Sequence, residues 1–247
     1  MGCTGSDAGF ALGRLKQLIP GWTLTESRRT STVRPSFMSN ISLTQIVSWI
    51  ERYAAHIAEQ KDYLTQLDAA IGDADHGANM HRGFKAVLAK KADQPATDIG
   101  AFLKLVAMTL ISTVGGASGA LYGTFFLQAS SLANGKTELT PDEFAALLEK
   151  GLAGIVLRGK AAIGDKTMVD ALQPAIKACK RALEAGEPLA TALSAAVTAG
   201  EEGLKSTIPL VARKGRASYL GERSAGHADP GATSTVLLFR AAAETLS

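Results

Sequence analysis

An acidic turn lies between residues 67 and 77, where the chain reads L-D-A-A-I-G-D-A-D-H-G. Its three carboxylates, Asp68, Asp73 and Asp75, are followed directly by His76. Their spacing does not place them on one face of a helix, so we expect a loop between two helices in which the carboxylates converge. Carboxylates this close repel one another unless a cation holds them, and hard oxygen ligands suit Mg²⁺ or Ca²⁺. The turn therefore predicts a divalent-cation site, and its residue types alone do not choose between Mg²⁺ and Ca²⁺.

A calcium-binding EF-hand does not fit this turn. With Asp73 and Asp75 as the first and third loop positions, the pattern requires glycine at residue 78 and glutamate at residue 84. The chain has Ala78 and Phe84 there. An ordinary Asp-Gly turn without a ligand is the simpler alternative, but three acids with a histidine and Asn79 in one turn favour a metal site that works with phosphate.

Two other segments could contact an anion. Residues 114–119, V-G-G-A-S-G, precede a helix, and the N–H groups at a helix N-terminus attract phosphate. Close helix packing at small residues explains this segment equally well. Residues 213–223 carry four positive charges and two glycines, which suits either arginine binding to phosphate or a solvated basic loop.

Neither a P-loop nor a nucleophile elbow is present. Residues 159–167 resemble a P-loop, but Asp165 intrudes before the lysine and no strand precedes the segment. In residues 116–119 the second glycine comes one position too early for an elbow, and a sheet is missing. Carboxylate-bound metal, glycine-rich loops and arginine together indicate phosphoryl transfer, which depends on positioning and charge neutralisation.

The segments that must position these loops have a helical pattern almost throughout. Ser42 and Gln45 form a capping box before an apolar stripe that extends to about residue 60. Thr140-Pro141-Asp142-Glu143 and Asp229-Pro230 mark two further helix starts. We expect an all-α domain of about eight helices. Its irregular turns should cover residues 71–77, 113–118, 158–167 and 211–229, and Pro174 should bend or delay the helix over 168–185.

Charge and cysteine content narrow the class of protein. Residues 1–40 carry five basic and two acidic groups, which accounts for the net charge of +3, because the other 207 residues have 21 groups of each sign. The folded body therefore offers no basic excess for nucleic acid. Cys3 and Cys179 make no disulfide framework, which favours a cytoplasmic location.

Neither a signal peptide nor a membrane span is expected. Arg14 and Lys16 interrupt the apolar stretch near the N-terminus. The uncharged segment 105–135 is long enough to cross a bilayer, but Gly115 and Gly116 divide it, so we expect two buried helices there. Residues 1–37 are interpreted as a disordered or non-native extension before Met38.

Four long motifs resemble the nucleotide-binding L subunits of dihydroxyacetone kinases. They occupy residues 67–84, 114–119, 158–168 and 215–234, in the order of that family, and the likeness runs from about Met38 to the end. The resemblance implies that residues 38–247 form one ADP/Mg-binding helical domain. Its fold would be a closed barrel or bundle of about eight antiparallel helices with the nucleotide site at one end.

The resemblance also implies the ligands. Tightly bound ADP would be bridged by two Mg²⁺ ions on Asp68, Asp73 and Asp75, and no residue is assigned as a catalytic nucleophile or base. The positions that match nucleotide contacts in the family are His76, Gly77, Ala78, Asn79, Ala117, Ser118, Gly159, Met168, Arg216, Asp229, Pro230 and Gly231.

The implied activity is phosphoryl transfer to dihydroxyacetone. In the phosphotransferase-linked form, a phosphohistidine on a donor M subunit rephosphorylates the ADP in place, and the γ-phosphoryl passes to dihydroxyacetone on a K subunit. We expect this form because 25.7 kDa leaves no room for a substrate-binding domain. Alternatives are an ATP-dependent dihydroxyacetone kinase domain, or an ADP-Mg-binding adaptor that regulates a partner such as a transcription regulator. A homodimer is possible, and no nucleic-acid or membrane partner is expected.

Overall fold

The computed structural model of the protein describes residues 39–246, so the prediction for residues 1–37 lies outside the described residues. Within the described range there are nine α-helices, one 3-10 helix and a pair of two-residue strands. In chain order the elements are β1 (Ile41–Ser42), α1 (Leu43–Glu59), α2 (Lys61–Ile71), α3 (His76–Asp93), α4 (Ile99–Thr113), α5 (Gly116–Leu132), β2 (Glu138–Leu139), α6 (Pro141–Gly159), α7 (Val169–Glu184), α8 (Leu189–Ser206), η1 (Arg216–Ser224) and α9 (Pro230–Thr245).

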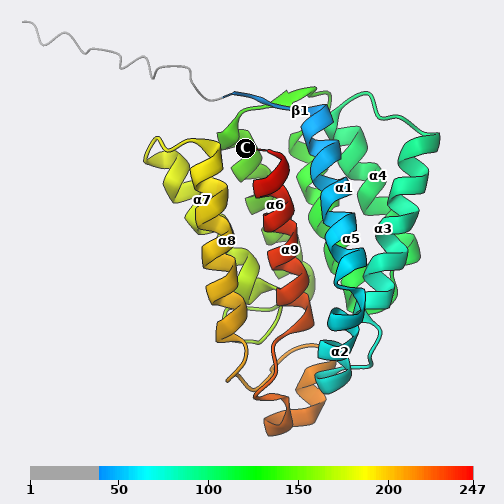
Figure 1. The fold of residues 1–247 in the computed structure, drawn as a ribbon, viewed down its shortest axis with the longest axis vertical. Helices are drawn as coiled ribbons and strands as arrows, with labels where there is room; N and C mark the ends of the chain where they lie inside the picture. The colour runs from blue at the N-terminus through cyan, green and yellow to red at the C-terminus, as the bar shows by residue number, and fades with distance from the viewer. Residues whose placement is uncertain (1–38, 247) are drawn as a thin grey trace, which may run out of the picture. The chain divides into compact units, whose positions relative to one another are not determined.

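Eight of these helices form a closed ring (Figure 1). Each helix packs against the next in the order α1, α3, α4, α5, α6, α7, α8 and α9, and α9 packs against α1. Neighbouring helices alternate in direction, as expected for helices joined by short connections (Figure 1). The short helix α2 packs against α3, α9 and η1 and lies with η1 at the lower end of the view. The predicted closed bundle of about eight antiparallel helices is confirmed.

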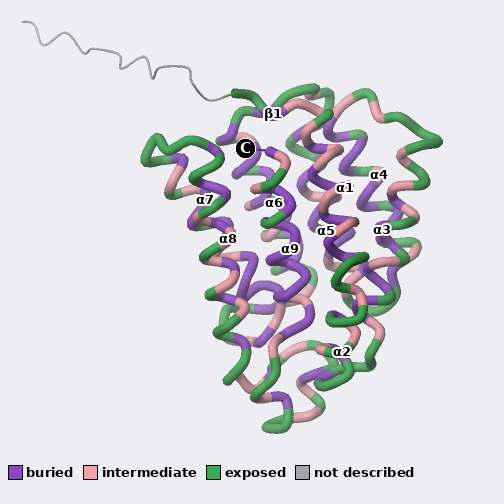
Figure 2. The backbone as a smooth tube through the Cα atoms, in the orientation of Figure 1, coloured by how far each residue is buried: buried purple, intermediate pink, exposed green. Residues whose placement is uncertain are grey.

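The inside of the ring is an apolar core built from the inward faces of the helices (Figure 2). Trp49 of α1 packs edge-on against Phe144 of α6 with ring centroids 5.4 Å apart. The Nε1–H of Trp49 donates to the carbonyl oxygen of Leu238 at 2.9 Å, which joins α1 to α9 where the ring closes. The antiparallel strands β1 and β2 pair Ile41 with Leu139 and bring the start of α1 next to the start of α6.

Three helix starts agree with the sequence. Both parts of the capping box are present at Ser42 and again at Thr140, and the side chain of Asp229 caps α9. The predicted break in the long apolar segment is also found, because α4 ends at Thr113 and α5 begins at Gly116. None of the described helices has the combination of length and apolar character that crossing a membrane requires.

Three local predictions need correction. The acidic loop is limited to residues 72–75, because α2 continues to Ile71 and α3 begins at His76. Residues 216–224, within the predicted irregular turn, form the 3-10 helix η1, which a kink at Gly221 interrupts. Of the two effects predicted for Pro174, the delayed helix start is wrong, because Pro174 lies inside α7. The predicted bend stays a prediction. Proline provides no N–H for the carbonyl oxygen of Asp170, and Gly203 of α8 lies against this oxygen, since a β-carbon there would be only 2.1 Å from it.

Candidate functional site

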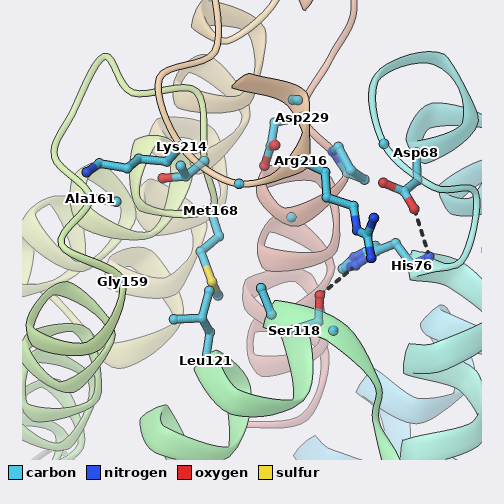
Figure 3. Close-up of a pocket in the computed structure, with 18 of the residues that line it drawn as sticks. Asp68, His76, Ser118, Leu121, Gly159, Ala161, Met168, Lys214, Arg216 and Asp229 are labelled. Carbon is cyan, nitrogen blue, oxygen red and sulfur yellow. Dashed lines mark hydrogen bonds between the residues drawn. The ribbon is translucent and has the colours of Figure 1, made fainter. Parts of the chain in front are cut away.

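The alternating ring brings the N-termini of α3, α5, α7 and α9 to the same end of the barrel. Each N-terminus has N–H groups without helical partners and the positive end of the helix dipole, although side chains accept from the N–H groups of His76, Val169 and Ala232. A cavity of about 390 Å³ lies at this end and is lined by residues from all four N-termini and from η1 (Figure 3). The fold therefore provides a site that attracts anions before any side chain is considered.

The three carboxylates of the acidic turn converge at one side of this cavity. Each can place an oxygen within 4.8 Å of an oxygen of the other two. Asp68, in the last turn of α2, is buried, and its Oδ2 accepts the N–H groups of Asp75 at 2.8 Å and His76 at 3.1 Å. These bonds fold the turn back on α2. Three carboxylates that line a cavity and converge on one point provide oxygen ligands of the kind that a hard divalent cation prefers.

The side chain of Arg216 extends from η1 into the cavity (Figure 3). Its Nε is 2.7 Å from Oδ2 of Asp73. Both side chains are partly exposed, so this pair contributes little to stability. The ion pair instead holds the guanidinium of Arg216 in the lining of the cavity, where it could bind an oxyanion.

The imidazole of His76 is buried between α5 and α9. Nδ1 lies 2.9 Å from Oγ of Ser118, and Nε2 lies 3.0 Å from Oγ of Ser234. Burial lowers the pKa of His76 to about 4, and the nearby negative charge of Asp68 opposes this shift only in part. The ring is therefore neutral at neutral pH.

Lys166 and Asp229 form a second charged region. Nζ of Lys166 donates to the carbonyl oxygens of Thr207 at 2.7 Å and His227 at 2.5 Å. Oδ2 of Asp229 accepts the N–H of Ala232 at 2.7 Å. Burial raises the pKa of Asp229 to about 7; the N–H of Ala232 opposes the shift, Asp170 adds to it, and the ammonium of Lys166 offsets part of it.

Another part of the cavity wall is apolar. Leu121, Ile155, Ala161, Met168 and Val169 line it, and Leu121 and Met168 lie together in Figure 3. An apolar wall beside a polar, anion-attracting floor suits a ligand with one flat apolar part and one charged part, and the volume is in the range of small-molecule sites.

Twelve of the fifteen residues predicted for the site line the cavity. They are Asp68, Asp73, Asp75, His76, Ala117, Ser118, Gly159, Met168, Arg216, Asp229, Pro230 and Gly231.

The other three predicted residues lie in the first turn of α3, away from the cavity lining. A β-carbon on Gly77 would lie 2.0 Å from the carbonyl oxygen of Lys61, so this glycine permits α3 to approach α2. Asn79 is buried, and its Oδ1 accepts from Nη2 of Arg82 at 2.6 Å. Ala78 is exposed. Nucleotide contact by these three residues stays a prediction.

Sequence reasoning missed three polar residues in or behind the cavity. Lys166 was considered only as the lysine of an incomplete P-loop, and no local pattern distinguished Ser234 from its neighbours. Tyr122 gave no signal, because it is one aromatic residue among several in an apolar helix.

Comparison with known proteins decides the family. A DAK2 domain profile matches residues 70–244, which is most of the chain. This chain belongs to the DAK2 domain family. The match begins two residues after Asp68 and includes the other residues predicted for the site.

Individual relatives of this DAK2-family chain agree with the resemblance seen in its motifs. It is 46% identical over 201 residues to the PEP-dependent dihydroxyacetone kinase, ADP-binding subunit DhaL, of Escherichia coli K12, covering 81% of this chain and 96% of that one. It is 38% identical over 207 residues to the PTS-dependent dihydroxyacetone kinase, ADP-binding subunit DhaL, of Lactococcus lactis, covering 84% and 100%. The predicted membership of the L-subunit family is confirmed.

A solved structure shows the same fold. The dihydroxyacetone kinase from C. freundii in complex with AMP-PNP and Mg²⁺ matches with a TM-score of 0.63 and 27% sequence identity. The match covers 91% of this chain and 37% of that longer chain.

Proposed function

We propose that this DAK2-family chain is the nucleotide-binding subunit of a phosphoprotein-dependent dihydroxyacetone kinase and acts in the cytoplasm. It would hold ADP tightly while a phosphohistidine of a donor M subunit phosphorylates it in place. The γ-phosphoryl would then pass to dihydroxyacetone on a K subunit and give dihydroxyacetone phosphate. The observation that carries this proposal is the convergence of three carboxylates, four helix N-termini and Arg216 on one cavity.

The carboxylates would hold the metal. Asp68, Asp73 and Asp75 would share two Mg²⁺ ions, and three protein ligands leave coordination positions for phosphate oxygens and water. The fit rests on their convergence within 4.8 Å and on the N–H bonds that orient Asp68. When bound, Mg²⁺-ADP would supply the terminal phosphate that receives and releases the phosphoryl group.

The other cavity residues would bind and orient the nucleotide. N–H groups at Ala117 and Ser118 and at the start of α9 would donate to phosphate oxygens. Arg216 would exchange its contact with Asp73 for a phosphate oxygen and neutralise charge there. The apolar wall with Met168 would pack against the adenine ring.

Similarity favours phosphoprotein over ATP as the phosphoryl source. The two relatives that this chain matches at 46% and 38% identity, over 96% and 100% of their length, are named PEP- and PTS-dependent, whereas this chain covers only 37% of the longer C. freundii kinase. A K subunit and a phosphohistidine donor are therefore the partners that we propose.

Reconstitution tests the proposed function. The purified chain is mixed with a K subunit and dihydroxyacetone, and either ATP or a phosphorylated donor protein is added as the only phosphoryl source. We expect dihydroxyacetone phosphate with the donor protein. Turnover with ATP alone would indicate an ATP-dependent kinase, and bound nucleotide without turnover would indicate an adaptor.

A second measurement tests tight binding. The protein is purified without added nucleotide and denatured, and the supernatant is analysed for adenine nucleotides. We expect about one ADP for each chain, since a site with this many converging charges should release the nucleotide slowly. A nucleotide-free preparation that also fails to bind added Mg²⁺-ADP would contradict the proposal.

A further inference from the structure

The acidic side and the phosphate side of the cavity come from different elements. The acidic turn leads into α3, whereas Gly115, Gly116 and Ser118 lie in the connection between α4 and α5 and at the start of α5. A ligand that binds both sides at once needs them at a fixed separation, because a misplacement of about 1 Å can cost much of the binding or of the rate. The contacts between α3 and the α4–α5 connection therefore matter for the whole site.

Arg82, in the second turn of α3, joins these two parts. Its Nη2 donates to Oδ1 of Asn79 at 2.6 Å, and its Nε donates to the carbonyl oxygen of Thr113 at 3.0 Å. Thr113 ends α4, so this carbonyl oxygen has no partner within its own helix. The N–H of Asn79 donates to the carbonyl oxygen of Asp75 at 2.8 Å. A single guanidinium thus connects the end of the acidic turn with the end of α4.

The direction of both bonds is fixed, because the nitrogens of arginine only donate. The amide oxygen of Asn79 therefore faces Arg82, and the Nδ2 end of the planar amide lies away from it. Beyond the chain neighbours of Gly115, a β-carbon on this glycine would lie nearest to Nδ2, at 3.4 Å, with Oδ1 at 3.7 Å. Asn79 is 6% exposed, so the surrounding atoms leave its amide little freedom. Arg82 therefore holds this amide against Gly115, which lines the cavity.

Close packing accompanies these bonds. A β-carbon on Gly83, the residue after Arg82, would lie 2.2 Å from Cγ2 of Val114, so α3 approaches the α4–α5 connection closely. Val114 is buried. Apolar contacts of this kind set a distance but have no direction. The bonds of Arg82 add the direction, because they fix the orientation of the Thr113 peptide group.

We propose that Arg82 is a positioning residue that holds the first turn of α5 in register with the acidic turn. Arg82 does not itself line the cavity. Through Thr113 and Asn79 it fixes Gly115, so that the N–H groups at the start of α5 meet the phosphate oxygens of a nucleotide whose divalent cation is held by the carboxylates. The identity of this ligand rests on the proposed function.

Backbone ¹⁵N relaxation tests the positioning without any nucleotide. In the wild type we expect Gly115 and Gly116 to be as rigid as the helices, with order parameters of about 0.8. In Arg82→Met, which keeps most of the aliphatic stem and removes both donors, these values should fall below about 0.6. Gly135, in the turn after the other end of α5, should keep its wild-type value.

Lys85→Met is the matched control. Lys85 is also an exposed cation of α3, about one turn later, and this variant should leave both glycines rigid. Arg82→Lys should restore rigidity only in part, because a single ammonium lacks the fork that bonds two separate oxygens.

Calorimetric titration tests the consequence for the ligand. Nucleotide-stripped Arg82→Met should bind Mg²⁺-ADP about tenfold more weakly than the wild type, equivalent to about one hydrogen bond. Lys85→Met should bind as the wild type does. A purely structural role of Arg82 would lower the stability against urea and leave this affinity unchanged.

A double-mutant cycle on the same affinity tests whether Arg82 acts through Asn79. If it does, removing both side chains weakens binding by less than the product of the two separate losses. Asn79→Ala provides the second change, and Asn79→Leu, of similar volume, replaces it if that variant does not fold.

Several outcomes overturn the proposal. They are flexible glycines in the wild type, rigid glycines in Arg82→Met, a loss of rigidity that Lys85→Met reproduces, unchanged Mg²⁺-ADP affinity in Arg82→Met, or fully independent losses in the cycle. A wild type that binds no nucleotide would contradict the proposed function, while the relaxation measurement still decides whether Arg82 positions the turn.

Discussion

At the scale of single residues, the cavity contains carboxylates in two different environments. Asp73 and Asp75 lie in a partly exposed turn, where water and a cation can reach them. Asp229 is buried at the start of α9, and its pKa is raised to about 7. The same side-chain type therefore serves as a candidate metal ligand in one place and as a costly buried group in the other.

Replacing Asp73 by asparagine tests the metal site. Asp73→Asn removes one of three charged ligands and the partner of Arg216, so Mg²⁺-ADP affinity should fall on the order of 100-fold, since even residues outside the first coordination shell matter by 10–100-fold. Kinase activity in the reconstituted system should fall with it. Asp62→Asn, on an exposed side chain of α2, is the control and should leave both unchanged. Wild-type affinity in Asp73→Asn would disprove the metal role.

The raised pKa of Asp229 predicts a dependence of stability on pH. In the unfolded chain this carboxyl ionises near pH 4, whereas the folded protein keeps its proton up to a pH of about 7. The folded state thus binds more protons between these values, and the contribution of Asp229 to the free energy of unfolding falls by up to about 1.4 kcal/mol per pH unit as pH rises.

Asp229→Asn isolates this effect, because asparagine still caps a helix but does not titrate. Urea unfolding of nucleotide-free protein at pH 5 and pH 7.5 should show the variant gaining stability relative to the wild type at the higher pH. An equal difference at both pH values would contradict the raised pKa.

At the scale of elements, connecting segments close the cavity end of the ring. Lys166 lies between α6 and α7 with a φ of 62° and is almost completely buried. Its ammonium binds carbonyl oxygens that follow α8 and precede α9, so one side chain joins three connections. This contact positions Asp229 and the start of α9 relative to the cavity.

Lys166→Met should loosen this end of the barrel. The carbonyl oxygens of Thr207 and His227 would lose a charged donor, at a cost of roughly 2–4 kcal/mol in unfolding free energy. Amide hydrogen exchange should rise in residues 207–229 more than in α1 or α4. Lys205→Met, at an exposed position near the end of α8, is the control. Unchanged exchange in the 207–229 segment would show that other contacts hold it.

At the scale of the whole molecule, the number and direction of helices create the site. With eight helices alternating around a closed ring, alternate N-termini must meet at one end. The loops at that end contain the motifs that resemble the kinase family. The other end has the short strand pair and the C-terminus of α9, with no candidate ligand cluster among the described residues.

The domain boundary predicted at Met38 can be tested on the whole molecule. A chain that begins at Met38 should unfold within about 0.5 kcal/mol of the full chain, as expected when no core contact is removed. Its Mg²⁺-ADP affinity should also be unchanged. Denaturant unfolding and calorimetry measure both, and a chain that fails to fold would place residues 1–37 within the domain.

The helices and the acidic turn could be predicted from local patterns in the sequence. The capping boxes at Ser42 and Thr140 and the Asp229-Pro230 start depend on residues at most three positions apart, so they could be read directly. The extent of η1 could not, because it depends on packing of this segment against α2.

The sequence by itself determined that carboxylates, glycine-rich helix starts and a basic segment are present, since each is a short stretch of residue types. Only the tertiary structure decided which of them meet and in what chemical state. His76 contacts Ser118 and Ser234, which are 42 and 158 positions away in the chain. Lys166 contacts the carbonyl oxygen of His227, which is 61 positions away. Such contacts, and the pKa values that follow from them, arise from closure of the ring, which removes water from groups that are distant in the chain.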